Sequence, residues 1–197
     1  MARVTARRVQ LFDQLVALFL DEGFAHLTLD EIAARLHCSK STLYTVAAGK
    51  DDLVRAVTVH FFRTATDAVE DAVAAHADPL QQVSAYLEAV GDQLSAASHQ
   101  FMEDLAASTS ARQVYEKNTS IAASRVREMI VRGVEAGVFR EVHASFVADA
   151  ASNTMVRIQQ RDVYKATGLD DAQAYRELAA LITTGIAATG APLPSTT

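Results

Sequence analysis

The sequence of 197 residues contains one cysteine, three prolines, eight glycines and no tryptophan. A single cysteine, Cys38, excludes an internal disulfide and fits a reducing compartment. Because helix-breaking residues are few and Ala, Leu and Val are abundant, we expect an all-α fold. No apolar run reaches the ~20 residues that a membrane-spanning helix needs, and the basic N-terminus leads into an amphipathic helix, not into a signal peptide. We therefore expect a cytoplasmic protein that contacts no membrane.

The sequence also has none of the common catalytic or metal-binding patterns. The six histidines are scattered, and there is no H-E-x-x-H, no G-x-S-x-G and no Gly-rich phosphate loop. His99 and Glu103 share a helical face, but two ligands do not make a metal site. We expect no enzymatic activity, no cofactor and no metal, so an enzyme built among the helices is the least favoured function.

Charge is distributed unevenly along the chain. The net charge of −6 argues at first against nucleic acid, but residues 1–63 carry a balance of +1 and the remainder carries −7. The positive bias lies at the N-terminal end, where Arg3, Arg7 and Arg8 could form an arm that reaches phosphates or the minor groove. A merely solvated terminus is an equally good interpretation of these arginines.

Residues 28–53 read TLDEIAARLHCSKSTLYTVAAGKDDL and predict two short helices joined by a tight turn. Thr28 and Glu31 form a T-x-x-E capping box that starts the first helix. Ser39 can cap the second helix, at about 40–45. This is the pattern of a helix-turn-helix, whose second helix enters the DNA major groove.

The second helix carries side chains suited to that role. Its polar residues can hydrogen-bond phosphates or base edges, whereas Leu43 alone is fully apolar and should anchor the helix. From helix geometry alone, a solvated surface helix in any all-helical protein is an equally good interpretation.

The run S-K-S-T-L-Y…G-K-D-D-L resembles the DNA-binding segment of the TetR family of bacterial transcriptional regulators. The resemblance covers about 45 residues and extends upstream through T-x-x-E-I-A, which begins at Thr28, to the G-F at Gly23 and Phe24. Two departures stand out. Val46 and Ala47 replace the usual aromatic pair, and His37 replaces a small residue, often Gly, before the turn, so His37 should adopt a left-handed conformation.

The resemblance implies a set of DNA contacts. Tyr44 and Lys50 would bind phosphates, and Lys40, Ser41, Thr42 and Thr45 would face base edges. The full set expected at a double-stranded DNA operator is Thr28, Ser39, Lys40, Ser41, Thr42, Tyr44, Thr45 and Lys50.

We expect about nine helices in two domains. A helix-turn-helix domain would span 1–52, a helical ligand-binding and dimerisation domain 53–191, and a disordered tail 192–197. Apolar periodicity and caps place helices at about 5–21, 50–75, 79–94, 144–166 and 172–189. A short helix should begin at Ser98, and a longer one should run from a Ser110-x-x-Gln113 capping box to about 136. The first helix should bury Val9, Phe12, Val16, Phe19 and Leu20.

In the TetR family the last two helices usually form a four-helix dimer interface. The residues expected there are Ala151, Met155, Tyr175, Leu178 and Ile182, with an ordinary intramolecular core as the alternative. Helical bundles also hold ligands between their helices. Polar or aromatic residues on the apolar stripes are the candidates for a mostly apolar effector: Phe62, Tyr86, Phe101, Met102, Tyr115, Asn118, Asn153 and Arg157.

The sequence therefore favours a dimeric transcriptional regulator, a ligand-responsive repressor that binds a palindromic operator. The alternative is a helical small-molecule binding protein of the same fold with weak or lost DNA binding. The presence of Val46 and Ala47 in place of the usual aromatic pair favours this alternative.

Overall fold

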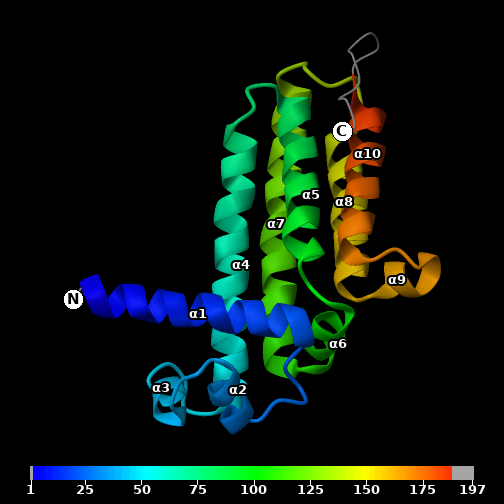
Figure 1. Cartoon of the computed structure of the whole chain (residues 1–197). Helices are drawn as coiled ribbons and strands as arrows, with labels where there is room; N and C mark the ends of the chain where they lie inside the picture. Colours follow the sequence, from blue (N-terminus) through cyan, green and yellow to red (C-terminus); the bar gives the residue numbers. More distant parts are fainter. Residues whose placement is uncertain (1, 188–197) are drawn as a thin grey trace. The chain divides into compact units, whose positions relative to one another are not determined.

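The structure is a computed structural model that describes residues 2–187, with side chains from residue 6 onward (Figure 1). Across this part of the chain it contains ten helices and no strand, which confirms the all-α fold. The helices are α1 (Ala2–Glu22), α2 (Leu29–Arg35), α3 (Lys40–Tyr44), α4 (Lys50–Ala74), α5 (Pro79–Ser95), α6 (His99–Ala107), α7 (Thr109–Glu135), α8 (Ala144–Gln159), α9 (Asp162–Thr167) and α10 (Asp171–Ile186). The tail predicted at 192–197 lies outside the described residues. No helix between residues 2 and 187 combines the length and apolarity of a membrane span.

The chain divides into two compact units. Unit 1 consists of Met1–Thr64 and Ala96–Tyr115, and unit 2 consists of Ala65–Ser95 and Glu116–Thr197. Helices α4 and α7 each contribute residues to both units. Unlike the domains 1–52 and 53–191 expected from sequence, the units are discontinuous: helix α6 joins the N-terminal segment.

Helix α1 supplies much of the core of unit 1. Its buried stripe centres on Leu15, which is fully buried, together with Leu11, Phe12 and Phe19. The expectation that Val9 is buried was wrong, since 45% of Val9 is exposed. The stripe is thus shifted around the helix from its predicted position. Against α4, the Phe12 ring stacks on His60 with centroids 5.1 Å apart.

Helix α6 packs on α1 within unit 1. Ser98 caps α6, as predicted, and its N–H donates to the Leu20 carbonyl at 2.8 Å. Phe101 then meets the ring of Phe24 at a centroid distance of 6.0 Å. These contacts attach α6 to the end of α1 and to the turn that follows it.

Unit 2 is built around α5 and α10, which pack along each other. Gly91 permits this approach, because a Cβ there would lie 3.0 Å from the Ala172 carbonyl oxygen. Arg125 on α7 donates two hydrogen bonds of 2.9 Å to the Glu70 carboxylate on α4. Burial raises the pKa of Tyr86 on α5 to about 12, and the Glu70 carboxylate adds to this.

The single helix predicted for 144–166 is interrupted, which is why ten helices are found where about nine were expected. Arg161 takes a left-handed conformation (φ 64°) between α8 and α9. Its side chain turns inward and pairs with Asp171 at 2.6 Å, with both side chains buried. The buried ion pair joins Arg161 to Asp171, ten positions further along the chain, and it determines where the helix is interrupted. The apolar periodicity of the sequence does not reveal this pair.

The start of α7 also differs from the prediction. The helix begins at Thr109, and the Oγ of Ser108 accepts the N–H of Ala111 at 3.4 Å. The predicted capping box of Ser110 and Gln113 was therefore wrong, since both residues lie inside the helix. Ser108 is a cap of the same chemical kind two positions earlier, and it also ends α6.

Candidate nucleic-acid interface

The first helix of the predicted helix-turn-helix begins at a complete capping box. The Thr28 Oγ1 accepts the Glu31 N–H at 3.2 Å, and the Glu31 carboxylate accepts the Thr28 N–H at 2.7 Å. Hydrogen bonds from the Thr28 backbone and hydroxyl lower the pKa of Glu31. Ile32 and Ala33 are buried, so α2 is fixed both at its start and along its inner face.

The turn between α2 and α3 contains the conformation that the sequence predicts. His37 has φ 49°, a value in the left-handed region, and its side chain is exposed. The half-buried Cys38 donates its N–H to the Ala33 carbonyl at 2.9 Å and closes the turn. The structure thus confirms that His37 does what a glycine would do more easily.

Helix α3 has one buried side chain and an exposed polar surface. Ser39 caps it by accepting the Thr42 N–H at 3.2 Å. Leu43 is 1% exposed and anchors the helix, whereas Tyr44 is 51% exposed. The Tyr44 side chain is therefore available to a partner, while the helix that carries it is held by Leu43.

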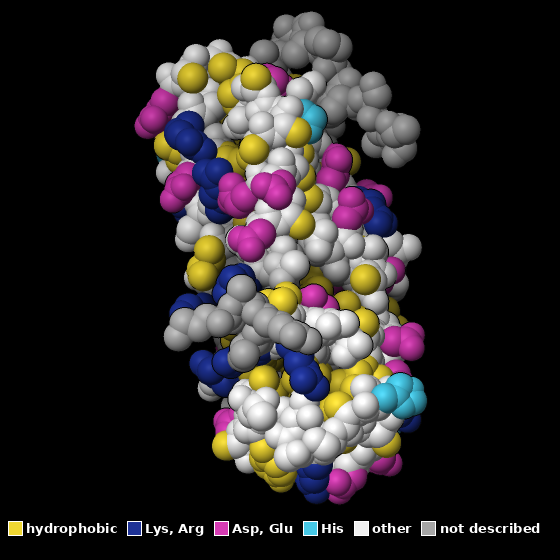
Figure 2. Space-filling model, turned by 60° about the vertical axis from the view of Figure 1, so that its left-hand side comes forward, with side chains coloured by type: hydrophobic (Ala, Val, Ile, Leu, Met, Phe, Trp, Pro, Cys, Tyr) yellow, Lys and Arg dark blue, Asp and Glu magenta, His cyan; other side chains and the backbone are white. Residues whose placement is uncertain are grey.

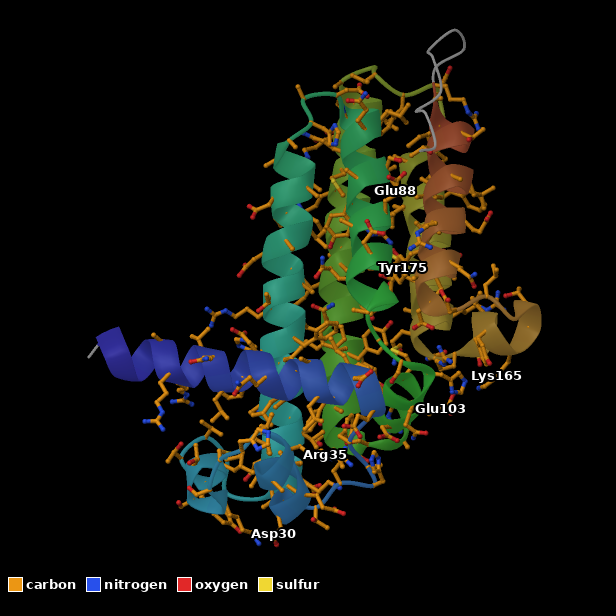
Figure 3. The ribbon with its side chains drawn as sticks, in the orientation of Figure 1. Asp30, Arg35, Glu88, Glu103, Lys165 and Tyr175 are labelled. Carbon is orange, nitrogen blue, oxygen red and sulfur yellow. The ribbon has the colours of Figure 1, made fainter. Side chains whose placement is uncertain are left out.

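Several of the expected contact residues already have partners within the protomer. The Lys40 ammonium donates to Asp30 at 2.8 Å, which raises the pKa of Lys40 (Figure 3 shows Asp30 on α2). The half-buried Thr42 lies 2.9 Å from Ser39 through its hydroxyl. The Thr45 hydroxyl donates to the Thr42 carbonyl at 2.6 Å. Ser41 and Tyr44, both exposed, complete this surface.

Lys50 opens α4, and its ammonium donates to the Ala25 carbonyl at 2.7 Å. An ammonium has three N–H donors, so this bond leaves two for another acceptor. Arg7 and Arg8 on α1 are exposed, and the Arg8 guanidinium lies 5.9 Å from the centre of the Phe12 ring. On the face of unit 1 drawn in Figure 2, Lys and Arg side chains gather around α1. The side chain of Arg3 lies outside the described part.

The residues expected at an effector site are distributed over both units. Phe62, Phe101, Met102 and Tyr115 lie in the core of unit 1, where the rings of Phe62 and Tyr115 stack 5.0 Å apart. The other four belong to unit 2: Tyr86 is buried, Asn118 is half-buried, and Asn153 and Arg157 are exposed. Sequence alone could not separate Phe62 and Tyr115 from the residues of unit 2, because α4 and α7 contribute residues to both units.

The five residues expected at a dimer interface are all core residues of the protomer: Ala151, Met155, Tyr175, Leu178 and Ile182 are each at most 7% exposed. Burial raises the pKa of Tyr175 (labelled in Figure 3). The same two helices carry other apolar side chains that are exposed. Phe146 on α8 and Leu181 on α10 are each 71% exposed, and Val156 is 38% exposed.

The residues described offer no metal centre, since no group of three His, Cys, Asp or Glu side chains is placed to hold an ion. What they do define is a capped helix-turn-helix with an exposed second helix. Residues 11–57 match the family model of the bacterial regulatory proteins, tetR family. The match covers the helix-turn-helix and confirms the resemblance drawn from the sequence.

Solved structures share the fold over nearly the whole chain. A TetR family transcriptional regulator, PfmR from Thermus thermophilus, is 20% identical with a TM-score of 0.61, over 88% of this chain and 97% of that one. The fatty acid degradation regulator FadR from Bacillus halodurans is 16% identical with a TM-score of 0.64, over 89% and 97%. A transcriptional regulator from Cytophaga hutchinsonii is 14% identical with a TM-score of 0.70, over 91% and 97%. A search of curated sequences gave no significant match. The chain thus combines a segment that matches the tetR family model with the fold of TetR-family regulators.

Proposed function

We propose that this protein is a sequence-specific transcriptional regulator, a ligand-responsive repressor that binds a palindromic operator as a homodimer in the cytoplasm. The observation that carries the proposal is the division of α3 into two sides. Leu43 fixes the helix to the core, and Tyr44 stands exposed beside a row of hydroxyl groups. A helix mounted in this way can enter the major groove without disturbing the fold that supports it.

The side chains differ in the role that they can take. Tyr44 and Lys50 serve as phosphate contacts, which set the register of the protein on the duplex. Ser41 and Thr45 are exposed and can reach base edges, whereas Lys40 must first exchange its Asp30 partner. Ser39 and Thr28 present their hydroxyls at the starts of the two helices.

The dimer would form through the exposed apolar side chains of α8 and α10. Phe146 and Leu181 are large, and each leaves more than two thirds of its surface in water. Burying them against a second copy is favourable by about 1.5–3 kcal/mol for each side chain that becomes fully covered. A two-fold axis would then place two α3 helices on successive major grooves, about 34–36 Å apart or at a multiple of that distance.

The effector would bind among the helices of the bundle and shift the equilibrium between two states of the dimer. The aromatic side chains of the candidate set favour a mostly apolar molecule, and one structural relative is a fatty acid degradation regulator. Movement of α4 would change the spacing of the two α3 helices. An effector needs a coupling free energy of about 1–3 kcal/mol to do this.

The proposal is tested by selecting bound duplexes from a random DNA library near physiological salt. The wild type is compared with Tyr44→Ala and with Ile121→Ala, which removes a side chain of similar exposure from α7. We expect a palindromic consensus from the wild type and from Ile121→Ala. Tyr44→Ala should bind that consensus about 10-fold more weakly, the loss of one hydrogen bond to a charged group, with an unchanged melting temperature.

Absence of any enriched sequence for the wild type would overturn the proposal. It would favour the alternative, a small-molecule binding protein of the same fold whose DNA binding is weak and independent of sequence. Equal binding by wild type and Tyr44→Ala would remove Tyr44 from the contact set.

A further inference from the structure

The turn between α1 and α2 is held by a buried carboxylate from α6. Asp104 is 5% exposed, and its Oδ2 accepts the N–H of Phe24 at 2.6 Å and the N–H of Ala25 at 2.7 Å. Its other oxygen accepts the Gln100 amide at 2.7 Å. Three donors satisfy the carboxylate, which is the condition for keeping a charge inside the protein.

The backbone of the turn is shaped to admit this carboxylate. Gly23 has φ 78°, and a Cβ at this position would lie 2.6 Å from the Asp104 Oδ2. Glycine is therefore required twice, once for its conformation and once for the space. The G-F pair at Gly23 and Phe24 is part of the family resemblance, but the sequence gives no sign of its partner 80 residues away.

Ala25 connects this carboxylate to the DNA-binding surface. Its N–H is held by Asp104, and its carbonyl accepts the Lys50 ammonium at 2.7 Å. A cavity of about 530 Å³ opens beside Ala25, Lys50 and Asp104. The peptide of Ala25 is thus held by a hydrogen bond at its N–H and at its carbonyl, beside this open space.

We propose that Asp104 is a positioning residue for DNA binding: its carboxylate fixes Ala25, and the Ala25 carbonyl holds the Lys50 ammonium where it can donate to a DNA phosphate. This inference rests on the proposed function, in which Lys50 is a phosphate contact. The Ala25 bond uses one of three ammonium donors, so it orients Lys50 without occupying it. A lysine ordered before binding loses less side-chain entropy when the duplex arrives.

The test is a double-mutant cycle between Asp104→Asn and Lys50→Met, with Glu103→Gln as the matched control on α6. Glu103 is exposed (Figure 3), so this variant removes one charge from the same helix without touching the turn. Binding is measured by titration with the consensus duplex selected above and with a random duplex of about 30 base pairs at low salt, which reports the sequence-independent phosphate contacts. The melting temperature of each variant reports on folding.

We expect Asp104→Asn to weaken binding to the consensus by about 3- to 10-fold, the cost of ordering one long side chain. In the Lys50→Met background the same change should cost less than about twofold. Lys50→Met alone should reduce the salt slope of binding by about 1. An equal loss from Asp104→Asn in both backgrounds would show a merely structural role and would overturn the inference.

Amide hydrogen exchange in the DNA-free protein separates this inference from the proposed function. Asp104→Asn should speed the exchange of Phe24 and Ala25, and Glu103→Gln should not. Unchanged exchange overturns the inference even if the protein binds DNA as proposed. Unchanged DNA binding by Lys50→Met overturns the role of Lys50 and the inference with it. Should Asp104→Asn fail to fold, Asp104→Glu retains the charge, moves the carboxylate by one methylene and is subject to the same measurements.

Discussion

Two residues other than glycine adopt a left-handed backbone in the described part of the chain, and they do so for opposite reasons. His37 has φ 49° in the helix-turn-helix, and its side chain is exposed. Arg161 has φ 64° between α8 and α9, and its side chain is buried against Asp171. At His37 the geometry of the turn imposes the left-handed conformation, although the side chain makes no buried contact. At Arg161 the same conformation accompanies a guanidinium that is buried in an ion pair with Asp171. The same strain therefore has a local cause in unit 1 and a tertiary cause in unit 2.

Arg161→Gly should produce the largest effect. Glycine relieves the backbone strain but removes the buried positive charge beside the Asp171 carboxylate, so we expect a loss of about 3–5 kcal/mol in the free energy of unfolding. Urea denaturation measures this, with Arg176→Ala as the control, since Arg176 lies inside α10, where glycine would add a cost of its own. Arg176 lies 3.5 Å from Asp92 in an exposed pair, and exposed pairs contribute at most about 1 kcal/mol. Equal losses from both variants would contradict the distinction drawn here.

Replacing both members of the buried pair should cost less than breaking it. In Arg161→Met with Asp171→Leu neither charge of this pair remains, so we expect the double variant to recover at least about 2 kcal/mol of the loss in Arg161→Gly. The same denaturation experiment checks this. If the double variant is as unstable as the single one, the left-handed backbone itself, and not the uncompensated charge, determines the stability.

His37→Gly should have the smallest effect, and of opposite sign. Glycine adopts φ 49° without steric cost, and no buried contact of His37 is lost, so the free energy of unfolding should rise by up to about 1 kcal/mol. The control is Ala34→Gly on the exposed side of α2, which should lower it by about 0.5–1 kcal/mol. Thermal unfolding of the two variants should move in opposite directions. A loss of stability in His37→Gly would reveal a role for the imidazole that the structure does not show.

The same contrast explains how far the sequence can be interpreted without the structure. The cap of α2 joins residues three positions apart, and the cap of α3 has the same spacing, so short windows predict both of them correctly. The left-handed His37 also follows from a local comparison with glycine. The bonds of Asp104 join residues 80 positions apart, which no short window contains. Arg161 and Asp171 are only ten positions apart, but they lie in different elements, so a helical period does not relate them.

Burial on α8 and α10 could not be assigned for a related reason. Each helix carries apolar residues on more than one side, and their identity does not say which side faces the protomer's own core. Met155 and Leu178 are in fact buried within the protomer, whereas Phe146 and Leu181 face solvent. Periodicity finds the apolar stripes, but only the packing of α10 against α5 and α8 decides which of them is inward.

The turn at Gly23 also limits the routes by which this sequence can diverge. A side chain at position 23 is opposed by the backbone conformation and by the Asp104 carboxylate together, so it cannot be the first change. Loss of Asp104 removes only that carboxylate; the Gln100 side chain, whose Cγ would lie 2.7 Å from the added Cβ, and the requirement for φ 78° remain. Substitutions at these two positions are therefore accessible in one order, and descendants of this protein that retain the carboxylate should inherit the glycine with it.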